Sequence, residues 1–192
     1  MAVVRRIFPS DCKSEGCRKR LHNRDAQEAL RERFRPADIR ILFVGESRPA
    51  SGHFFYQADS GLHRAMRATF SAASPNLATL GDEQFLPVFR DLGCYLVDLC
   101  AEPVDRLAPK ARRAACTAGE DDLARMLNEL RPKMVISILR SIGPNVERAI
   151  ARTGHAYPHV NLVYPGRWKH HRIAFRRKLI PTLRRSIAAI AR

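Results

Sequence analysis

Four short runs of consecutive apolar residues stand out along the chain, each flanked by polar or turn-forming positions. They cover residues 40–45, 94–100, 133–139 and 159–164. A strand that is apolar on consecutive residues has both of its faces buried, as in a parallel sheet that helices cover on both sides. The pattern therefore predicts four strands of one buried sheet.

Between these runs, apolar residues recur at the spacing of three to four that is typical of amphipathic helices. They predict helices over residues 61–73, 83–92, 119–130 and 143–152, and a basic helix over 172–191. Strands that alternate with helices indicate parallel pairing through helical crossovers. We therefore expect a three-layer α/β/α fold with a central four-stranded parallel sheet.

The stretch that precedes this pattern is polar and basic, which predicts a separate N-terminal segment. Residues 1–24 are expected to form a basic arm, either mobile or closing as a lid, and residues 25–192 a single domain. A chain of 192 residues can bury a core without disulfides or a structural metal.

The charge of the chain is strongly positive, with 34 Lys and Arg against 19 Asp and Glu and a net charge of +15. This excess favours nucleic acid as a partner over a membrane surface, because Lys and Arg neutralise backbone phosphates. The alternative is a merely soluble basic surface. No apolar run approaches the roughly 20 residues of a membrane-spanning helix, and residues 1–10 lack the apolar stretch of a secretory signal. We expect a monomeric cytoplasmic protein associated with the nucleoid.

The ligand site of a parallel α/β sheet lies beyond the carboxyl ends of the strands. This rule brings together residues 46–61, 98–106, 140–144 and 164–171. Gly45 would let the chain turn after the first strand, and Glu46 would then face the crevice. Phe54, Phe55 and Tyr56 follow, and stacking on such a ring is worth roughly 1 to 3 kcal/mol per base. The alternative is that these aromatic side chains belong to the core.

These segments resemble the signature motifs of the uracil-DNA glycosylase superfamily. Gly45, Glu46 and Phe55 match the first motif, and Asp98 stands where the second motif carries a base-reading Asn. Residues 132–143 resemble the third motif, and residues 163–172 resemble the final loop, which penetrates the duplex. The resemblance implies a monofunctional DNA glycosylase that flips a base out of DNA and hydrolyses its N-glycosidic bond, leaving an abasic site.

The resemblance also implies roles for the residues around the base. Glu46 would stabilise the oxocarbenium-like sugar and orient the attacking water, while Phe55, or Tyr56 one residue on, would stack on the base. Ser47 and Asp98 would complete the base-binding set. An ionised Asp98 only accepts hydrogen bonds, which suits the exocyclic amine of a cytosine-type base, such as a hypermodified phage cytosine. A protonated Asp98 would instead restore uracil recognition.

The final motif departs from the superfamily, because Tyr164 stands where a His is usual. Tyr164 would donate a hydrogen bond to the leaving base, or His170 would take over that role. A basic cluster that contains an aromatic ring can bind phosphates and fill the gap that the flipped base leaves in the DNA stack. The DNA-binding residues expected here and after the third strand are Ser141, Gly143, Gly166, Arg167, Trp168, Lys169 and His171.

The five cysteines, an odd number, indicate reduced thiols and no disulfide framework. One branch of the superfamily holds a [4Fe-4S] cluster, which needs four thiolates. The matching positions here would be Cys12, Cys17, Cys100 and Cys116. Because Cys12 and Cys17 are spaced more widely than the C-x-x-C of that branch, we expect no cofactor and keep the cluster as the alternative.

Two other functions stay open. A module that recognises modified or damaged bases without cutting DNA would also explain the basic charge and the altered final motif. A hydrolase of free nucleotides is the weaker alternative, because the net charge exceeds what a small anion requires and the chain has no Gly-rich phosphate loop.

Overall fold

The computed structural model describes residues 15–79, 81–166 and 168–188, and these fall into two compact units. The first unit, residues 1–33, holds helix α1 (Glu15–Arg33). The second unit, residues 34–192, holds all the other elements. Of the predicted N-terminal arm, residues 15–24 belong to α1, and residues 1–14 lie outside the described part of the chain.

The second unit is built on a four-stranded sheet with the order β2-β1-β3-β4. Its strands are β1 (Ile41–Gly45), β2 (Cys94–Asp98), β3 (Met134–Ser137) and β4 (His159–Asn161). All three pairings are parallel, so the carboxyl ends of the strands gather at one edge of the sheet. Every residue of β1 is buried, as its run of apolar residues predicted.

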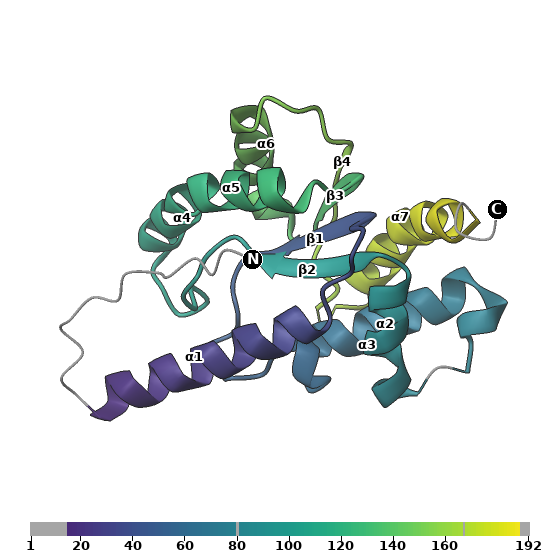
Figure 1. Ribbon diagram of the computed structural model, residues 1–192, viewed down its shortest axis with the longest axis horizontal. Helices are drawn as coiled ribbons and strands as arrows, with labels where there is room; N and C mark the ends of the chain where they lie inside the picture. The colour runs from purple at the N-terminus through teal and green to yellow at the C-terminus, as the bar shows by residue number, and fades with distance from the viewer. Residues whose placement is uncertain (1–14, 80, 167, 189–192) are drawn as a thin grey trace. The chain divides into compact units, whose positions relative to one another are not determined.

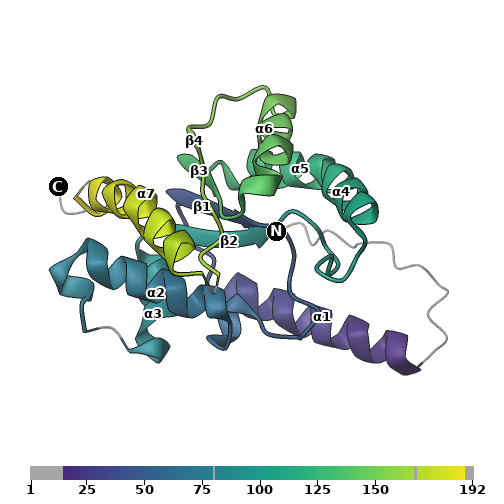
Figure 2. The same cartoon turned by 180° about the vertical axis from the view of Figure 1, so that it is seen from behind.

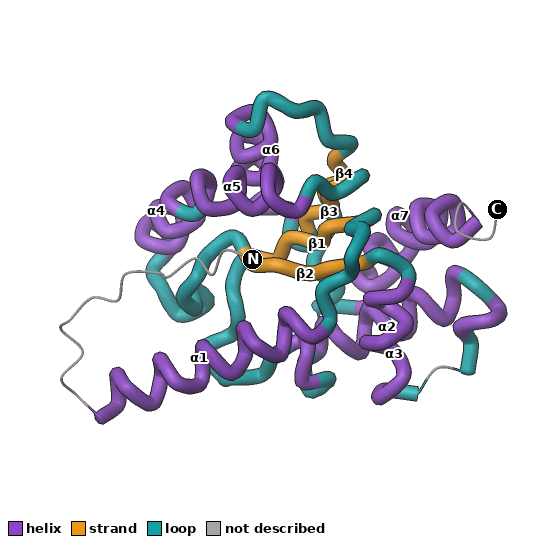
Figure 3. The backbone as a smooth tube through the Cα atoms, viewed as in Figure 1, coloured by secondary structure: helices purple, strands orange, loops and turns teal. Residues whose placement is uncertain are grey.

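Helices cover the sheet on both faces, with α4 (Pro109–Ala118), α5 (Glu120–Leu130) and α6 (Gly143–Arg152) on one side. The other side carries α2 (Gly61–Ala73), α3 (Asp82–Asp91) and α7 (Lys169–Ala188), as Figures 1 and 2 show from opposite directions. In Figure 3 the strands form the layer between the two groups of helices. The predicted three-layer α/β/α fold is therefore confirmed. None of the described helices is long and apolar enough to cross a membrane.

Three helices differ from the sequence-based prediction, which placed no helix before residue 61 and so missed α1. Helix α4 was not predicted, because its apolar positions are small alanines and Cys116. Helix α7 begins at Lys169, three residues before the predicted start. Ile173 in its first turns is 56% exposed, while Phe175, Leu179 and Leu183 provide its buried face.

Two contacts fix α4 and its neighbours beside the strand ends. Gly119 joins α4 to α5, and a Cβ atom at this position would overlap the carbonyl oxygen of Leu99, so the corner can lie directly on the chain after β2. Glu120, which is fully buried, accepts hydrogen bonds from Asn145 (2.7 Å) and from the guanidinium groups of Arg148 and Arg152 (2.6 Å each).

Burial alone would raise the pKa of Glu120, but the hydrogen bonds from Arg148, Asn145 and Arg152 outweigh burial and hold the pKa below its ordinary value. The carboxylate is therefore ionised at neutral pH. Because its partners all come from α6, this cluster locks α5 to α6.

Candidate active site

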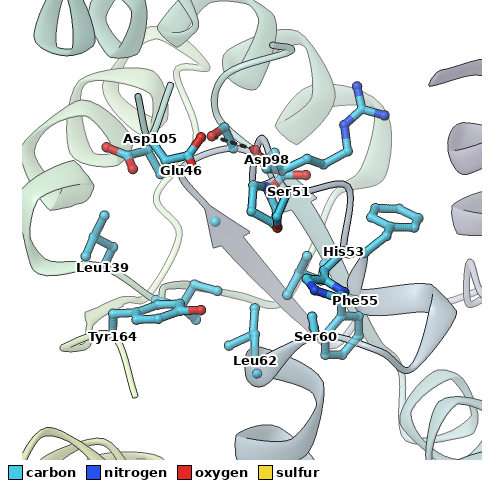
Figure 4. Close-up of a pocket in the computed structure, with 18 of the residues that line it drawn as sticks. Glu46, Ser51, His53, Phe55, Ser60, Leu62, Asp98, Asp105, Leu139 and Tyr164 are labelled. Atoms are coloured by element: carbon cyan, nitrogen blue, oxygen red, sulfur yellow. Dashed lines mark hydrogen bonds between the residues drawn. The ribbon is translucent and has the colours of Figure 1, made fainter. Parts of the chain in front are cut away.

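A cavity of about 420 Å³ opens at the carboxyl ends of the strands, within the size range of small-molecule sites. Glu46 reaches it from the end of β1, Asp98 from the end of β2, and Leu139 from the segment after β3. Phe55 and Tyr164 also line it. Figure 4 shows these side chains around the hollow, with Glu46, Asp98 and Asp105 toward one side of the view and Leu62 and Tyr164 toward the other.

The register of the sheet brings the first two carboxylates together. Gly45 lies opposite Asp98, and the pairing continues past the strand ends, where Cys100 N–H donates to the carbonyl of Glu46 (2.8 Å). A Cβ atom on Gly45 would lie 2.8 Å from Oδ1 of Asp98, closer than real Cβ contacts come. The expectation that Gly45 serves a sharp turn is wrong, because it belongs to β1 and its φ is not positive. The glycine instead leaves room for the Asp98 carboxylate in the position that it occupies, and a larger residue would make that side chain shift.

The Glu46 carboxylate is held by Arg112 of α4, a residue that sequence reasoning missed. Arg112 Nε donates to Oε1 of Glu46 at 2.7 Å, and Nη2 donates to Oε2, which makes a bidentate ion pair. The side chain of Glu46 is 11% exposed, whereas that of Arg112 is 38% exposed. The hydrogen bond to Glu46 raises the pKa of Arg112 above its ordinary value. The pair fixes the direction of the carboxylate and offsets its charge.

Phe55 and Tyr56 have different places. Phe55 is buried, lines the cavity and packs edge-on against Phe85 and Phe89. Tyr56 does not line the cavity; its hydroxyl donates to the carbonyl of Leu96 (3.0 Å) and accepts from Leu96 N–H (2.8 Å). Since β2 is an edge strand, Tyr56 satisfies backbone groups that no neighbouring strand pairs. Of the two rings, Phe55 is the one that lines the cavity.

A buried histidine supports Phe55 from within the aromatic cluster. The rings of His63 and Phe55 lie 5.8 Å apart, and neither ring nitrogen of His63 has a hydrogen-bond partner in the structure. Burial lowers the pKa of His63, so the imidazole is neutral at neutral pH. It acts as part of the wall behind the cavity.

Two contacts between the loops after β1 and β2 shape the mouth of the cavity, and a third lies within the loop after β1. Ser47 Oγ accepts from Val104 N–H (3.2 Å) and donates to the carbonyl of Arg48 (3.1 Å). Asp105 Oδ1 accepts from Ala50 N–H (3.0 Å). Ser47 lines the cavity as expected, but its hydroxyl holds these loops together.

The residues of the final motif separate in the structure. Tyr164 is 41% exposed and lines the cavity, and burial raises its pKa, so its phenol is a hydrogen-bond donor at neutral pH. His170 is exposed and does not line the cavity; its ring lies 4.4 Å from that of His171. Trp168 is 55% exposed and stacks on His170.

The other expected DNA-binding residues take varied positions. Lys169 lines a separate groove between α2 and α7, and the carbonyl of Gly166 accepts from Arg172 (3.2 Å). Arg167 lies outside the described residues. Ser141 is exposed and lines a second cavity, whereas Gly143 is buried against the Asn161 amide.

Two of the four cysteines that would ligate an iron–sulfur cluster lie beside Glu46. The Sγ atoms of Cys100 and Cys116 lie 3.7 Å apart, and Cys116 Sγ lies 3.8 Å from Oε1 of Glu46. Burial raises the pKa of both thiols, to about 12 for Cys100. Cys12 and the Cys17 side chain lie outside the described residues, among which no group of three or more metal-ligating side chains gathers. The absence of a cofactor stays a prediction, with the cluster as its alternative.

A Ser, His and Glu arrangement elsewhere in the sheet is structural. Ser137 Oγ lies 3.0 Å from Nε2 of His159, whose Nδ1 lies 3.6 Å from Glu147. Ser137 is fully buried, and its hydroxyl donates to Oδ1 of Asn161 (3.0 Å). A substrate cannot reach this oxygen. The Ser137 hydroxyl ties β3 to His159 and Asn161 of β4, and Glu147 reaches His159 from α6.

No protein-family model and no curated protein matches the chain. Its function therefore has to be inferred from the residues that line its cavities.

Replacing Tyr56 with Phe should lower the free energy of unfolding by about 1–3 kcal/mol, because two buried backbone groups of Leu96 lose their partner. Tyr157→Phe is a milder comparison, since the hydroxyl of the half-buried Tyr157 makes one hydrogen bond, to the carbonyl of Leu127. Chemical denaturation measures both. A Tyr56→Phe variant of unchanged stability and weakened base binding would contradict the structural role.

Proposed function

We propose that this protein is a monofunctional DNA glycosylase that takes a flipped base into the cavity at the strand ends and hydrolyses its glycosidic bond. The observation that supports this most is that Glu46 and Phe55, from the segment after β1, line one cavity with Asp98 from the end of β2. The net charge of +15 supports a DNA substrate. We also propose that the protein associates with the nucleoid.

Each lining residue has a role in the proposed reaction. The flipped base stacks on Phe55, and the Glu46 carboxylate lies beside the sugar, where it stabilises the cation that forms at C1′ and orients a water molecule. The C1′–N bond breaks with its electron pair going to the base, and the water oxygen bonds to C1′ and loses a proton. Tyr164 donates a hydrogen bond to the base, which departs as an anion and then takes up the proton that the water has lost.

The proposed base is of the cytosine type. Asp98 lies opposite Gly45 in the register, where its carboxylate can accept a hydrogen bond from an exocyclic amine. An ionised carboxylate repels the O4 oxygen of uracil. Uracil is the alternative target if the cavity protonates Asp98.

A binding module for modified bases is the second candidate. The bidentate contact between Arg112 and Glu46 favours it, because a carboxylate whose charge is offset stabilises a sugar cation less well. In that case the same cavity holds the base, and no bond breaks.

Glu46→Gln should lower the rate of base release at least about 100-fold while DNA binding is retained, because the amide keeps the shape of the side chain but loses its charge. The assay follows alkali-cleavable abasic sites in duplexes that carry cytosine, uracil or modified cytosines. Arg90→Gln, which removes an exposed charge on α3, is the control. If the wild-type protein binds these duplexes and releases no base, the protein is a binding module and the proposed catalysis is wrong.

Asp98→Asn should shift the preference among these bases toward uracil by about tenfold or more, because the amide can donate to O4 and accept from N3–H. Relative rates on cytosine-type and uracil duplexes measure the shift. A wild-type protein that already prefers uracil would contradict the role given to an ionised Asp98.

A further inference from the structure

A second cavity of about 440 Å³ lies behind the ion pair of Glu46 and Arg112. Both residues line this cavity and the base cavity, so the ion pair forms part of the wall between them. The rest of the second cavity comes from α4 and from the segment around the start of α6, including Ser141 and Asn145.

The second cavity is basic. Arg112, Arg113 and Arg148 line it against a single carboxylate, that of Glu46, which Arg112 already engages. Arg148 forms an ion pair with the buried Glu120, and the Arg148 side chain is nevertheless 51% exposed. A planar guanidinium group can bind a phosphate through two parallel hydrogen bonds.

The exposures of the ion pair decide which partner an incoming anion can reach. The Arg112 side chain is 38% exposed and the Glu46 side chain 11% exposed, so an anion in the second cavity reaches the guanidinium rather than the carboxylate. An anion on Arg112 competes with Glu46 for the same donor groups, which a guanidinium offers in a fixed fork.

We propose that the second cavity binds a backbone phosphate of the nucleic acid through Arg112 and Arg113, with Arg148 beside them, and that this phosphate draws Arg112 away from Glu46. The proposed consequence for catalysis rests on the proposed function: Glu46 carries its full charge toward the sugar only when the backbone is seated. A free nucleoside, which has no flanking phosphate, is then a poor substrate.

The test measures anion binding and needs no base release. Isothermal titration calorimetry at low ionic strength is carried out with inorganic phosphate and, separately, with a short single-stranded oligothymidine. Arg112→Gln should weaken phosphate binding about tenfold. Glu46→Gln should tighten it at least about threefold, because Arg112 loses its competitor.

Two further variants keep the result interpretable. Arg113→Gln should weaken phosphate binding without touching the ion pair, which covers the case in which Arg112→Gln does not fold. Arg90→Gln removes the same charge from α3, lines neither cavity and should bind phosphate as the wild type does.

Phosphate binding that is unchanged in Arg112→Gln, or no tighter in Glu46→Gln, would overturn the proposal. If Arg112→Gln weakens phosphate binding but not oligothymidine binding, the site serves free phosphate and the backbone assignment is wrong. A protein without glycosylase activity whose phosphate binding follows this pattern would refute the proposed function and leave the phosphate site in place.

Discussion

The ion pair between Glu46 and Arg112 is the interaction on which the candidate site depends. A carboxylate that is largely out of water is costly unless a partner offsets its charge and satisfies its lone pairs. Arg112 does both with two hydrogen bonds, and it reaches Glu46 from a helix that follows a different strand. The same contact that stabilises the folded site therefore limits the field that Glu46 can exert on a substrate.

The ion pair in turn depends on how tightly the surrounding backbone packs. Gly45 leaves room for Asp98 beside the end of β1, and Gly119 lets the corner between α4 and α5 lie on the carbonyl of Leu99. The buried Glu120 then fastens α5 to α6 through side chains from three positions of α6. The result is two cavities, one lined by aromatic rings and carboxylates and the other by arginines. This division suits a nucleic acid, whose aromatic bases form hydrogen bonds at their edges and whose backbone is anionic.

The sequence was sufficient for the sheet, because runs such as Ile41–Gly45 are short and apolar on consecutive residues, which is typical of a strand buried on both faces. It was also sufficient to bring Glu46, Phe55 and Asp98 together, since the carboxyl ends of parallel strands share one edge. It could not reveal Arg112, because α4 has only small apolar residues to mark its face and the pair spans 66 positions of the chain. Nor could it show that Phe55 lines the cavity whereas the hydroxyl of Tyr56 pairs with the backbone of Leu96.

The most direct measurement of the central claim is a crystal structure of the protein bound to a duplex that carries a 2′-fluorinated deoxycytidine, whose glycosidic bond resists hydrolysis. We expect the cytosine outside the stack, with its ring against Phe55, its amine on Asp98 and the Glu46 carboxylate beside C1′. A complex in which the base stays in the duplex, or in which DNA lies away from the strand ends and leaves this cavity unused, would contradict the assignment.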